Sequence, residues 1–432
     1  MSHSPEPVAL DMVDWPDAAR IGSLLVPPGP QASRSELTDL VAILRAAAHD
    51  AVGPLMDVTS MRPAPGRSLP GERWLASAHD SMQDSTQDDA PYAAPAAGSD
   101  PRIVVVDRAN WIGSTTAMLQ QMTAGLTDSL PRAAVPQGVA ARLLASAQVG
   151  ATLAFLAPRV LGQFDPYAQV TAPAASGRQA DGASGLPQSV NGLGDADVTG
   201  DAGASDSLHR QGRLLLIAPN LLATARSLEV NAQDFYLWVC LHEQTHALQF
   251  ACAPWLADHL QAKITKLLTG FGQGLADQMD APWGSKVKRR VTSLASLVNS
   301  VAGGADRQPL AHLLTPELRQ IFEDITAVMS LLEGHADVMM DAAGPGVVPS
   351  LELIRARFER RRDASRGLDA IIRKVMGMDM KLAQYRNGAA FVRGVHLEVG
   401  QQGLDTVWLK PENLPTVQEI AEPGLWVRRV HG

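Results

Sequence analysis

The segment from Leu241 to His246 combines residue types that bind zinc. It reads Leu-His-Glu-Gln-Thr-His, so His242 and His246 fall one turn apart on the same face of a helix. Two imidazole nitrogens on that face can converge on one ion, and Glu243 lies beside the coordination position that remains open. The spacing predicts a zinc ion held by His242 and His246, with Glu243 as the catalytic base.

The surrounding sequence predicts that this motif lies in a buried helix. Asn231 is a suitable N-cap, and residues 235–250 are apolar nearly all round the helix. Burying two histidines and a glutamate there costs on the order of several kcal/mol unless they are paired or bind metal. A chance HExxH segment and a buried hydrogen-bond network without metal stay open as alternatives, but the context favours a metal site.

A third ligand has to come from elsewhere in the chain. Gln249 and Cys252 occupy the positions where the longer HExxHxxGxxH motif has its glycine and third histidine. A second group of polar residues, Glu-Gly-His-Ala-Asp at 333–337, interrupts an otherwise apolar helix. That helix is predicted to begin after the N-cap Thr315 and to end at Gly344. It is the best source of the missing ligand.

Glu333 and Asp337 lie one turn apart on this second helix. Glu333 can complete coordination by two histidines and a glutamate, while Asp337 can accept the outer ring N–H of a ligand histidine. His335 points about 200° away from Glu333, so it is a candidate substrate contact or a core residue. His335 and Asp337 stay open as alternative third ligands, as does an ion-pair site without metal. Gly334 would let the two helices approach closely around a metal.

The remaining polar candidates are weaker. Tyr385 and Arg386, with Gln384 beside them, are candidate contacts for the substrate or the developing oxyanion, because a zinc hydrolase needs such a donor. His259 follows the motif helix and is assigned a structural rather than a catalytic role. Met339 and Met340 are assigned to the core.

The chain divides into three predicted parts. Residues 1–60 have helical spacing and predict an N-terminal helical element. Residues 61–100 are rich in Pro, Ser, Asp and Gly and predict a low-complexity linker. Residues 101–432 form the predicted catalytic domain, in which the Gly- and Asp-rich stretch 171–209 predicts a disordered surface insertion.

The elements of this domain predict a predominantly α, α+β fold with a small sheet around the buried motif helix. Apolar runs at 102–107 and 213–218 are flanked by turn formers and predict buried strands. Residues 391–409 alternate and predict a short strand or hairpin. Helices are predicted at 111–130, at 139–156 and over most of 231–380.

Composition narrows the class of protein. The 432 residues are 46% hydrophobic and 19% charged, as in an ordinary globular protein with a sizeable core. Without an apolar run of about 20 residues or a signal peptide, the chain is expected in the cytoplasm and off the membrane. The net charge of −8 disfavours nucleic acid, and the basic stretches at 286–290 and 355–362 are interpreted as helix surfaces. Two cysteines twelve residues apart form no metal pair.

The combination resembles a family of zincin-like proteins described as zinc-dependent metalloproteases, some of whose members are named for an association with deazaflavin coenzyme biosynthesis. The specific segments are LHEQTHALQF at 241–250, with PWL after it, and LLEGHADVMMD at 331–341. The resemblance implies a zincin-type catalytic fold, one zinc ion per chain and hydrolysis. It assigns Glu333 as the ligand on the second helix and Asp337 as the residue that orients the first histidine, as in gluzincins. Supporting segments are VVDRANWI at 105–112, LGQFDPY at 161–167, LLLIAPN at 214–220, KLAQYRNGAAFV at 381–392 and LPTVQEI at 414–420.

The predicted function is therefore that of a zinc-dependent hydrolase, with a metallopeptidase of gluzincin type as the specific form. Water activated by zinc would attack the carbonyl of a peptide or a small amide, with Glu243 as general base. The alternative is a metal-stabilised binding or scaffold protein that hydrolyses nothing. Such structural sites are usually closed by a fourth protein ligand.

Overall fold

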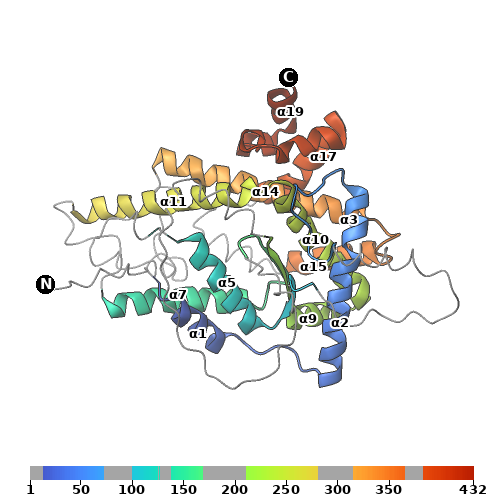
Figure 1. Cartoon of the computed structure of the whole chain (residues 1–432), viewed down its shortest axis with the longest axis horizontal. Coiled ribbons are helices and arrows are strands. Elements are labelled where there is room, and N and C mark those ends of the chain that lie inside the picture. The colour runs from blue at the N-terminus through green and yellow to red at the C-terminus, as the bar shows by residue number, and fades with distance from the viewer. Residues whose placement is uncertain are drawn as a thin grey trace, which may run out of the picture.

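The computed structural model describes residues 13–72, 100–124, 126, 138–168, 211–280, 315–364 and 383–432. Helices dominate these residues and surround one small sheet (Figure 1), which confirms the predicted fold class. The insertion predicted at 171–209 lies outside the described residues.

The sheet has three strands in the order β1-β3-β2. Both predicted strands are present, as β1 (Ile103–Val106) and β3 (Arg213–Ile217), and they pair in parallel. The third strand, β2 (Gly162–Asp165), pairs with β3 in the antiparallel direction and was not predicted. Its sequence, Gly-Gln-Phe-Asp, contains no β-branched residue, so the strand depends on its pairing with β3 rather than on local preference.

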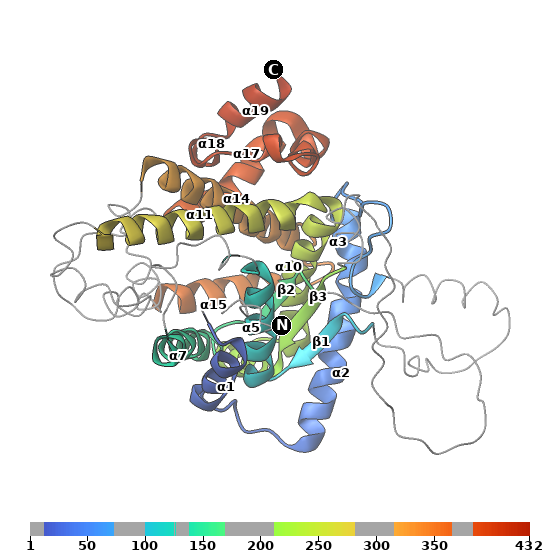
Figure 2. The ribbon, with the colours of Figure 1, turned by 60° about the vertical axis from the view of Figure 1, so that its left-hand side comes forward.

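Alternate residues of β3 face two hydrophobic clusters. Leu214 and Leu216 belong to the large core on one face of the sheet, and Leu215 and Ile217 belong to a smaller cluster on the other. Figure 2 shows the sheet between α5 (Arg108–Met122) and α10 (Ala232–Cys252). A strand covered on both faces is expected to be apolar throughout, as β3 is. The helices that contact the sheet include α2 (Arg34–Asp50), α5, α9 (Ala218–Leu228) and α10.

Two long helices carry the polar motifs. α10 begins at its predicted N-cap, where the Asn231 side chain accepts a hydrogen bond from the Asp234 amide. α14 (Pro316–Ala342) begins after Thr315, whose hydroxyl accepts from the Leu318 amide, and it confirms the second predicted helix. In Figure 1 α14 runs beside α11 (Trp255–Asp280), and it also packs on α10. This packing brings the two polar motifs together.

The N-terminal helices join the main core. α2 and α3 (Val52–Val58) contribute Leu44, Val52 and Leu55 to the same hydrophobic cluster as α10. The described first part of the predicted linker, residues 61–72, also packs there through Met61 and Leu69. These two large apolar side chains give this short piece of a polar segment enough buried surface to hold it on the core.

α7 (Val139–Leu156) has the bounds predicted from the sequence. It is long and apolar enough to cross a membrane by length and composition, yet it packs along α1 (Trp15–Leu25). A Cβ atom added to Gly150 would lie 2.5 Å from the Ala18 carbonyl oxygen, and one added to Gly22 would lie 2.9 Å from the Gly150 carbonyl oxygen. Small residues thus allow the two helix backbones to touch.

The strand or hairpin predicted at 391–409 was wrong, because this segment is helical. It forms most of α17 (Ala383–Asp405), with a break at Gly400, whose φ of 69° is non-helical. Phe391, Val392 and Val395 are buried, a spacing that belongs to one helix face. The valines and glycines of the segment suggested a strand, and packing on α14 overrode that preference. The remaining elements of the described residues are α15 (Leu351–Ala364), α18 (Val417–Ala421), α19 (Pro423–His431) and the short 3-10 helices η2 (Thr406–Trp408) and η3 (Pro411–Asn413).

Candidate metal centre

His242, His246 and Glu333 converge where α10 crosses α14. The Nε2 atoms of the two histidines lie 3.2 Å apart. Glu333 Oε2 lies 3.4 Å from His242 Nε2, and Glu333 Oε1 lies 3.7 Å from His246 Nε2. One ligand atom from each residue fits within 4.8 Å of the others, and this is the group among the described residues that could hold a metal ion.

The spacing of these atoms fits zinc. Ligands at about 2.0–2.1 Å from a tetrahedral zinc ion lie about 3.3 Å from one another, close to the separations observed. Two imidazole nitrogens that face each other beside a carboxylate offer lone pairs to a shared cation. The donor set of two histidines and one carboxylate is also one that catalytic zinc sites use.

Each histidine has a partner on the outer side of its ring. The Nδ1 atom of His242 lies 3.9 Å from Asp337 Oδ1, and the Nδ1 atom of His246 lies 2.9 Å from Gln249 Oε1. Such outer partners fix the orientation and tautomer of metal-binding histidines. Gln249 was not among the predicted site residues. Its spacing of three residues from His246 is the signal that could have identified it.

Glu243 lies against the backbone of the edge strand β2. A Cβ atom added to Gly162 would lie 2.5 Å from Glu243 Cγ and 2.7 Å from both Cδ and Oε1. The Glu243 side chain is buried and occupies the space that any other residue at 162 would fill. Gly162 is therefore part of the site; it lies in the LGQFDPY segment of the family resemblance, but no role was predicted for it because β2 was not predicted.

In the metal-free site the pKa values of the two carboxyl groups, Glu243 and Glu333, differ widely. Burial disfavours a charged His242, but the hydrogen bond with Glu333 and the nearby acidic groups raise its pKa to about 9. Burial also acts against ionised Glu333, but the two histidines lower its pKa to about 2. Burial raises the pKa of Glu243 to about 7; the positive charge of His242 acts to lower it, and the negative charge of Glu333 acts to raise it. Burial and the charge of His242 lower the pKa of His246.

The structure places the other candidates outside this group. His335 is fully buried and turned away from the three ligands; its Nδ1 lies 3.1 Å from Gln249 Nε2, and its ring packs edge-on against Trp408. Burial and the charge of His246 lower the His335 pKa to about 3. His259 packs against Trp255 on α11. Tyr385 and Arg386 lie in the first turn of α17, and their side chains are outside the described part of the chain.

Gly334 makes the close contact expected of it, but with a third helix. A Cβ atom at Gly334 would lie 2.1 Å from the Gly388 backbone, and one at Gly388 would lie 1.9 Å from the Ser330 carbonyl oxygen. The contact is therefore between α14 and α17, rather than between the two ligand-bearing helices. It holds the backbone of α14 next to Glu333 and brings the start of α17 beside the site.

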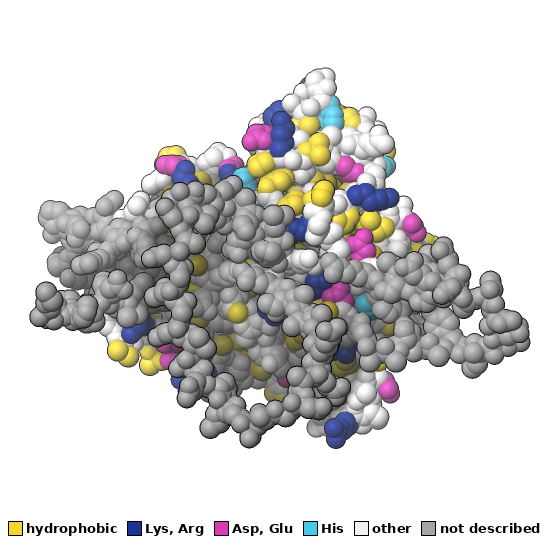
Figure 3. All heavy atoms as spheres, viewed as in Figure 1, with side chains coloured by type: hydrophobic (Ala, Val, Ile, Leu, Met, Phe, Trp, Pro, Cys, Tyr) yellow, Lys and Arg dark blue, Asp and Glu magenta, His cyan; other side chains and the backbone are white. Residues whose placement is uncertain are grey.

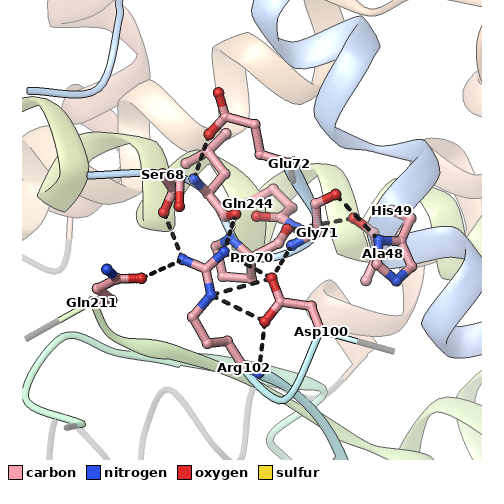
Figure 4. Close-up of polar contacts among 11 residues, drawn as sticks. Ala48, His49, Ser68, Pro70, Gly71, Glu72, Asp100, Arg102, Gln211 and Gln244 are labelled. Atoms are coloured by element: carbon pink, nitrogen blue, oxygen red, sulfur yellow. Dashed lines mark hydrogen bonds and ion pairs between the residues drawn. The ribbon is translucent and has the colours of Figure 1, made fainter. Parts of the chain in front are cut away.

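A buried polar cluster holds α10 from its other side (Figure 4). Gln244 donates to the carbonyl oxygens of Ala48 at 2.9 Å and Pro70 at 2.8 Å. Buried Arg102 donates to the carbonyl oxygens of the two residues before Pro70 and to Asp100 at 2.7 Å. The motif helix is thus fixed through the residue that follows Glu243.

Two comparisons with known proteins yield matches. A family model described as a zincin-like metallopeptidase matches residues 88–427. A crystal structure from Chloroflexus aurantiacus, described as a candidate hydrolase with a novel fold, is similar with a TM-score of 0.56 and 24% sequence identity, over 97% of this chain and 99% of that chain. At this identity the similarity concerns the fold. The comparison with curated proteins yields no match.

Proposed function

The chain belongs to the zincin-like metallopeptidase family, and on this premise we propose that it is a zinc-dependent amide hydrolase. Its one zinc ion is held by His242, His246 and Glu333, and Glu243 is the general base. The family assignment confirms the resemblance found in the sequence. The association with deazaflavin biosynthesis stays a prediction.

The observation that carries the proposal is a group of three candidate ligands that has no fourth member in the part of the chain that the structure describes. Within the described residues, no other His, Cys, Asp or Glu joins the group of three. The side chains of His242, His246 and Glu333 keep 21%, 14% and 42% of their exposure, so solvent and substrate reach the site. Structural zinc sites are closed by four protein ligands, whereas catalytic sites keep one position for water. This favours the enzyme over the binding or scaffold protein.

The chemistry follows from the placement of Glu243. When bound, zinc supplies Lewis-acid chemistry that acidifies water and polarises a carbonyl group. The Glu243 carboxylate takes a proton from the attacking water and gives it to the amide nitrogen as the C–N bond breaks. A pKa of about 7 in the metal-free protein suits a group that must both accept and return a proton near neutral pH. Gln249 holds the His246 ring by a hydrogen bond, and Asp337 lies 3.9 Å from the outer nitrogen of His242.

The edge strand β2 favours an extended peptide over a small amide as the substrate. β2 is the last strand in the sheet order and lies directly against Glu243 at Gly162. The outer edge of such a strand offers backbone N–H and C=O groups to an extended chain. Tyr385 and Arg386 are proposed as donors to the oxyanion, because the contact of Gly388 with α14 brings their part of α17 to the site.

Nucleic acid is not proposed as a partner, nor is a membrane, and the cytoplasm is the proposed compartment. On the face shown in Figure 3, basic and acidic side chains are interspersed over the described residues rather than gathered into a patch of one sign. A surface of mixed charge gives a polyanion little to bind.

Zinc analysis tests the metal centre. Purified protein is expected to hold one zinc ion per chain after loosely bound metal is removed, and the His246→Ala and Glu333→Ala variants are expected to lose it. Native protein without zinc would contradict the proposal. Loss in His246→Ala alone would move the third ligand to Asp337 or His335.

The base is tested separately with Glu243→Gln. This variant is expected to keep zinc and to abolish cleavage of a peptide library, with products detected by mass spectrometry. Retained cleavage would exclude Glu243 as the base. Absence of cleavage by zinc-loaded native protein would favour the scaffold protein.

A further inference from the structure

Gln249 lies between the two helices that carry the candidate ligands. It follows His246 by three residues on α10, and its side chain is fully buried. Its Oε1 lies 2.9 Å from His246 Nδ1. Its Nε2 lies 2.9 Å from the Leu332 carbonyl oxygen and 3.1 Å from His335 Nδ1, both on α14. One amide group therefore connects His246 to the residue before Glu333.

The contacts on α14 fix which way the amide faces. The Leu332 carbonyl oxygen can only accept a hydrogen bond, so the group beside it must be the NH2 of Gln249. The opposite orientation would bring two oxygen acceptors within 2.9 Å of each other and leave the Gln249 oxygen facing an acceptor instead of a donor. The Nδ1 lone pair of His335 accepts from the same NH2 group. The Gln249 oxygen is left facing His246.

This orientation determines the tautomer of His246. Because Gln249 Oε1 only accepts, His246 Nδ1 must carry the hydrogen. In the neutral ring the lone pair is then on Nε2. Nε2 is the atom that faces His242 at 3.2 Å and Glu333 at 3.7 Å, and it is the atom that a metal ion needs unprotonated.

We propose that Gln249 is a positioning residue that holds His246 in its metal-binding tautomer and orientation, and so raises the affinity of the site for zinc. The proposal rests on the zinc site of the proposed function. Asp337 lies on the corresponding side of His242, with its Oδ1 atom 3.9 Å from His242 Nδ1, which is longer than a hydrogen bond. His335 then serves as an acceptor that helps to orient Gln249.

The matched pair of variants is Gln249→Met and Gln244→Met. Methionine keeps the approximate length of the side chain but has no amide. Gln244 is a buried glutamine on the same helix whose NH2 also donates to two carbonyl oxygens, away from the ligands. Both variants lose a buried amide group, so any effect that comes only from weaker packing or lost hydrogen bonds is expected in both of them.

Two measurements separate the roles. Zinc affinity, from competition with a chromophoric chelator, is expected to fall about 10–100-fold in Gln249→Met and to stay within about 3-fold of native in Gln244→Met. Nitrogen-15 NMR of histidine-labelled, metal-free protein, assigned with a His246→Gln variant, is expected to show the Nδ1–H tautomer of His246 in native and Gln244→Met protein. The Nε2–H tautomer is expected to appear in Gln249→Met.

Gln249→Glu is the second test variant, for the case in which Gln249→Met fails to fold. Burial favours the neutral acid, whose OH can donate to the Leu332 carbonyl oxygen while its C=O oxygen accepts from His246 Nδ1, so the tautomer and the affinity for zinc are expected to be retained. Equal affinity in native protein and Gln249→Met, or an unchanged tautomer, would overturn the proposal. Native protein that binds no zinc but shows the expected tautomers would instead contradict the proposed function.

Discussion

Replacing Gly162 by alanine tests whether β2 determines the position of Glu243, the proposed catalytic base. The three atoms nearest the added methyl group all belong to Glu243, at 2.5–2.7 Å. Carbon atoms pack at about 3.5–4.0 Å, so the carboxyl group must move by about 1 Å. Overpacking of this kind costs about 1–3 kcal/mol in the free energy of unfolding. A displacement of about 1 Å at a reacting group lowers turnover by about 100-fold.

The Gly162→Ala variant is therefore expected to keep its zinc while its turnover of peptide falls by about 100-fold. Gly113→Ala is the control, since a Cβ atom there meets nothing within 4 Å and the residue is interior to α5. That control is expected to stabilise the protein by about 0.5–1 kcal/mol and to leave turnover unchanged.

A double-mutant cycle makes the test independent of catalysis. In a Glu243→Ala background the side chain that meets the new methyl group is gone, so Gly162→Ala is expected to cost close to nothing. Denaturation by urea should give a coupling free energy of about 1–3 kcal/mol between the two positions. Additive costs, or native turnover in zinc-loaded Gly162→Ala, would refute the placement of Glu243 against β2.

Two further predictions concern the charges around the site. The raised pKa of His242, about 9, means that metal-free protein loses the stability of the His242–Glu333 pair as pH rises from about 6.5 to 9, whereas zinc needs the unprotonated ring. The difference in Tm between zinc-loaded and metal-free protein should therefore grow over this window, and a constant difference would contradict the pairing. Arg102→Met is expected to lower the free energy of unfolding by about 3–5 kcal/mol, because it leaves the carboxylate of Asp100 without its cation. Chemical denaturation should show a smaller cost in an Asp100→Asn background, and an equal cost would mean that the ion pair is not what Arg102 contributes.

The helices and the ligand-bearing motifs were predictable because their signals are local. The cap at Asn231, the cap at Thr315 and the apolar periodicity of α10 and α14 lie within the helices that they define. Two histidines four residues apart must share a helix face, whatever the rest of the chain does. β1, β3 and α7 were predictable for the same reason, because each is a continuous, strongly apolar segment of the sequence.

The parts that were missed depend on contacts distant in sequence. β2 forms because Gln163 pairs with Leu215 and because the Gln163 side chain accepts a hydrogen bond from Trp111 Nε1 at 2.7 Å. Neither contact can be predicted from the four residues of β2 alone. α17 was mistaken for a strand because its valines favour β structure locally, while its burial on α14 favours a helix. Gln249 is next to His246 on the helix, but its orientation is set by Leu332, 83 residues further along the chain.

The same distant contacts explain why the metal centre can exist before metal binds. Backbone atoms, rather than flexible side chains, fix its parts: Gly162 bounds Glu243, the Leu332 carbonyl group orients Gln249, and Gly388 holds α14. A backbone contact loses little entropy when the site is completed, because the backbone is already ordered in the folded protein. Under the proposed function, zinc would displace the proton shared by His242 and Glu333, and most of the free energy of binding would remain available as affinity.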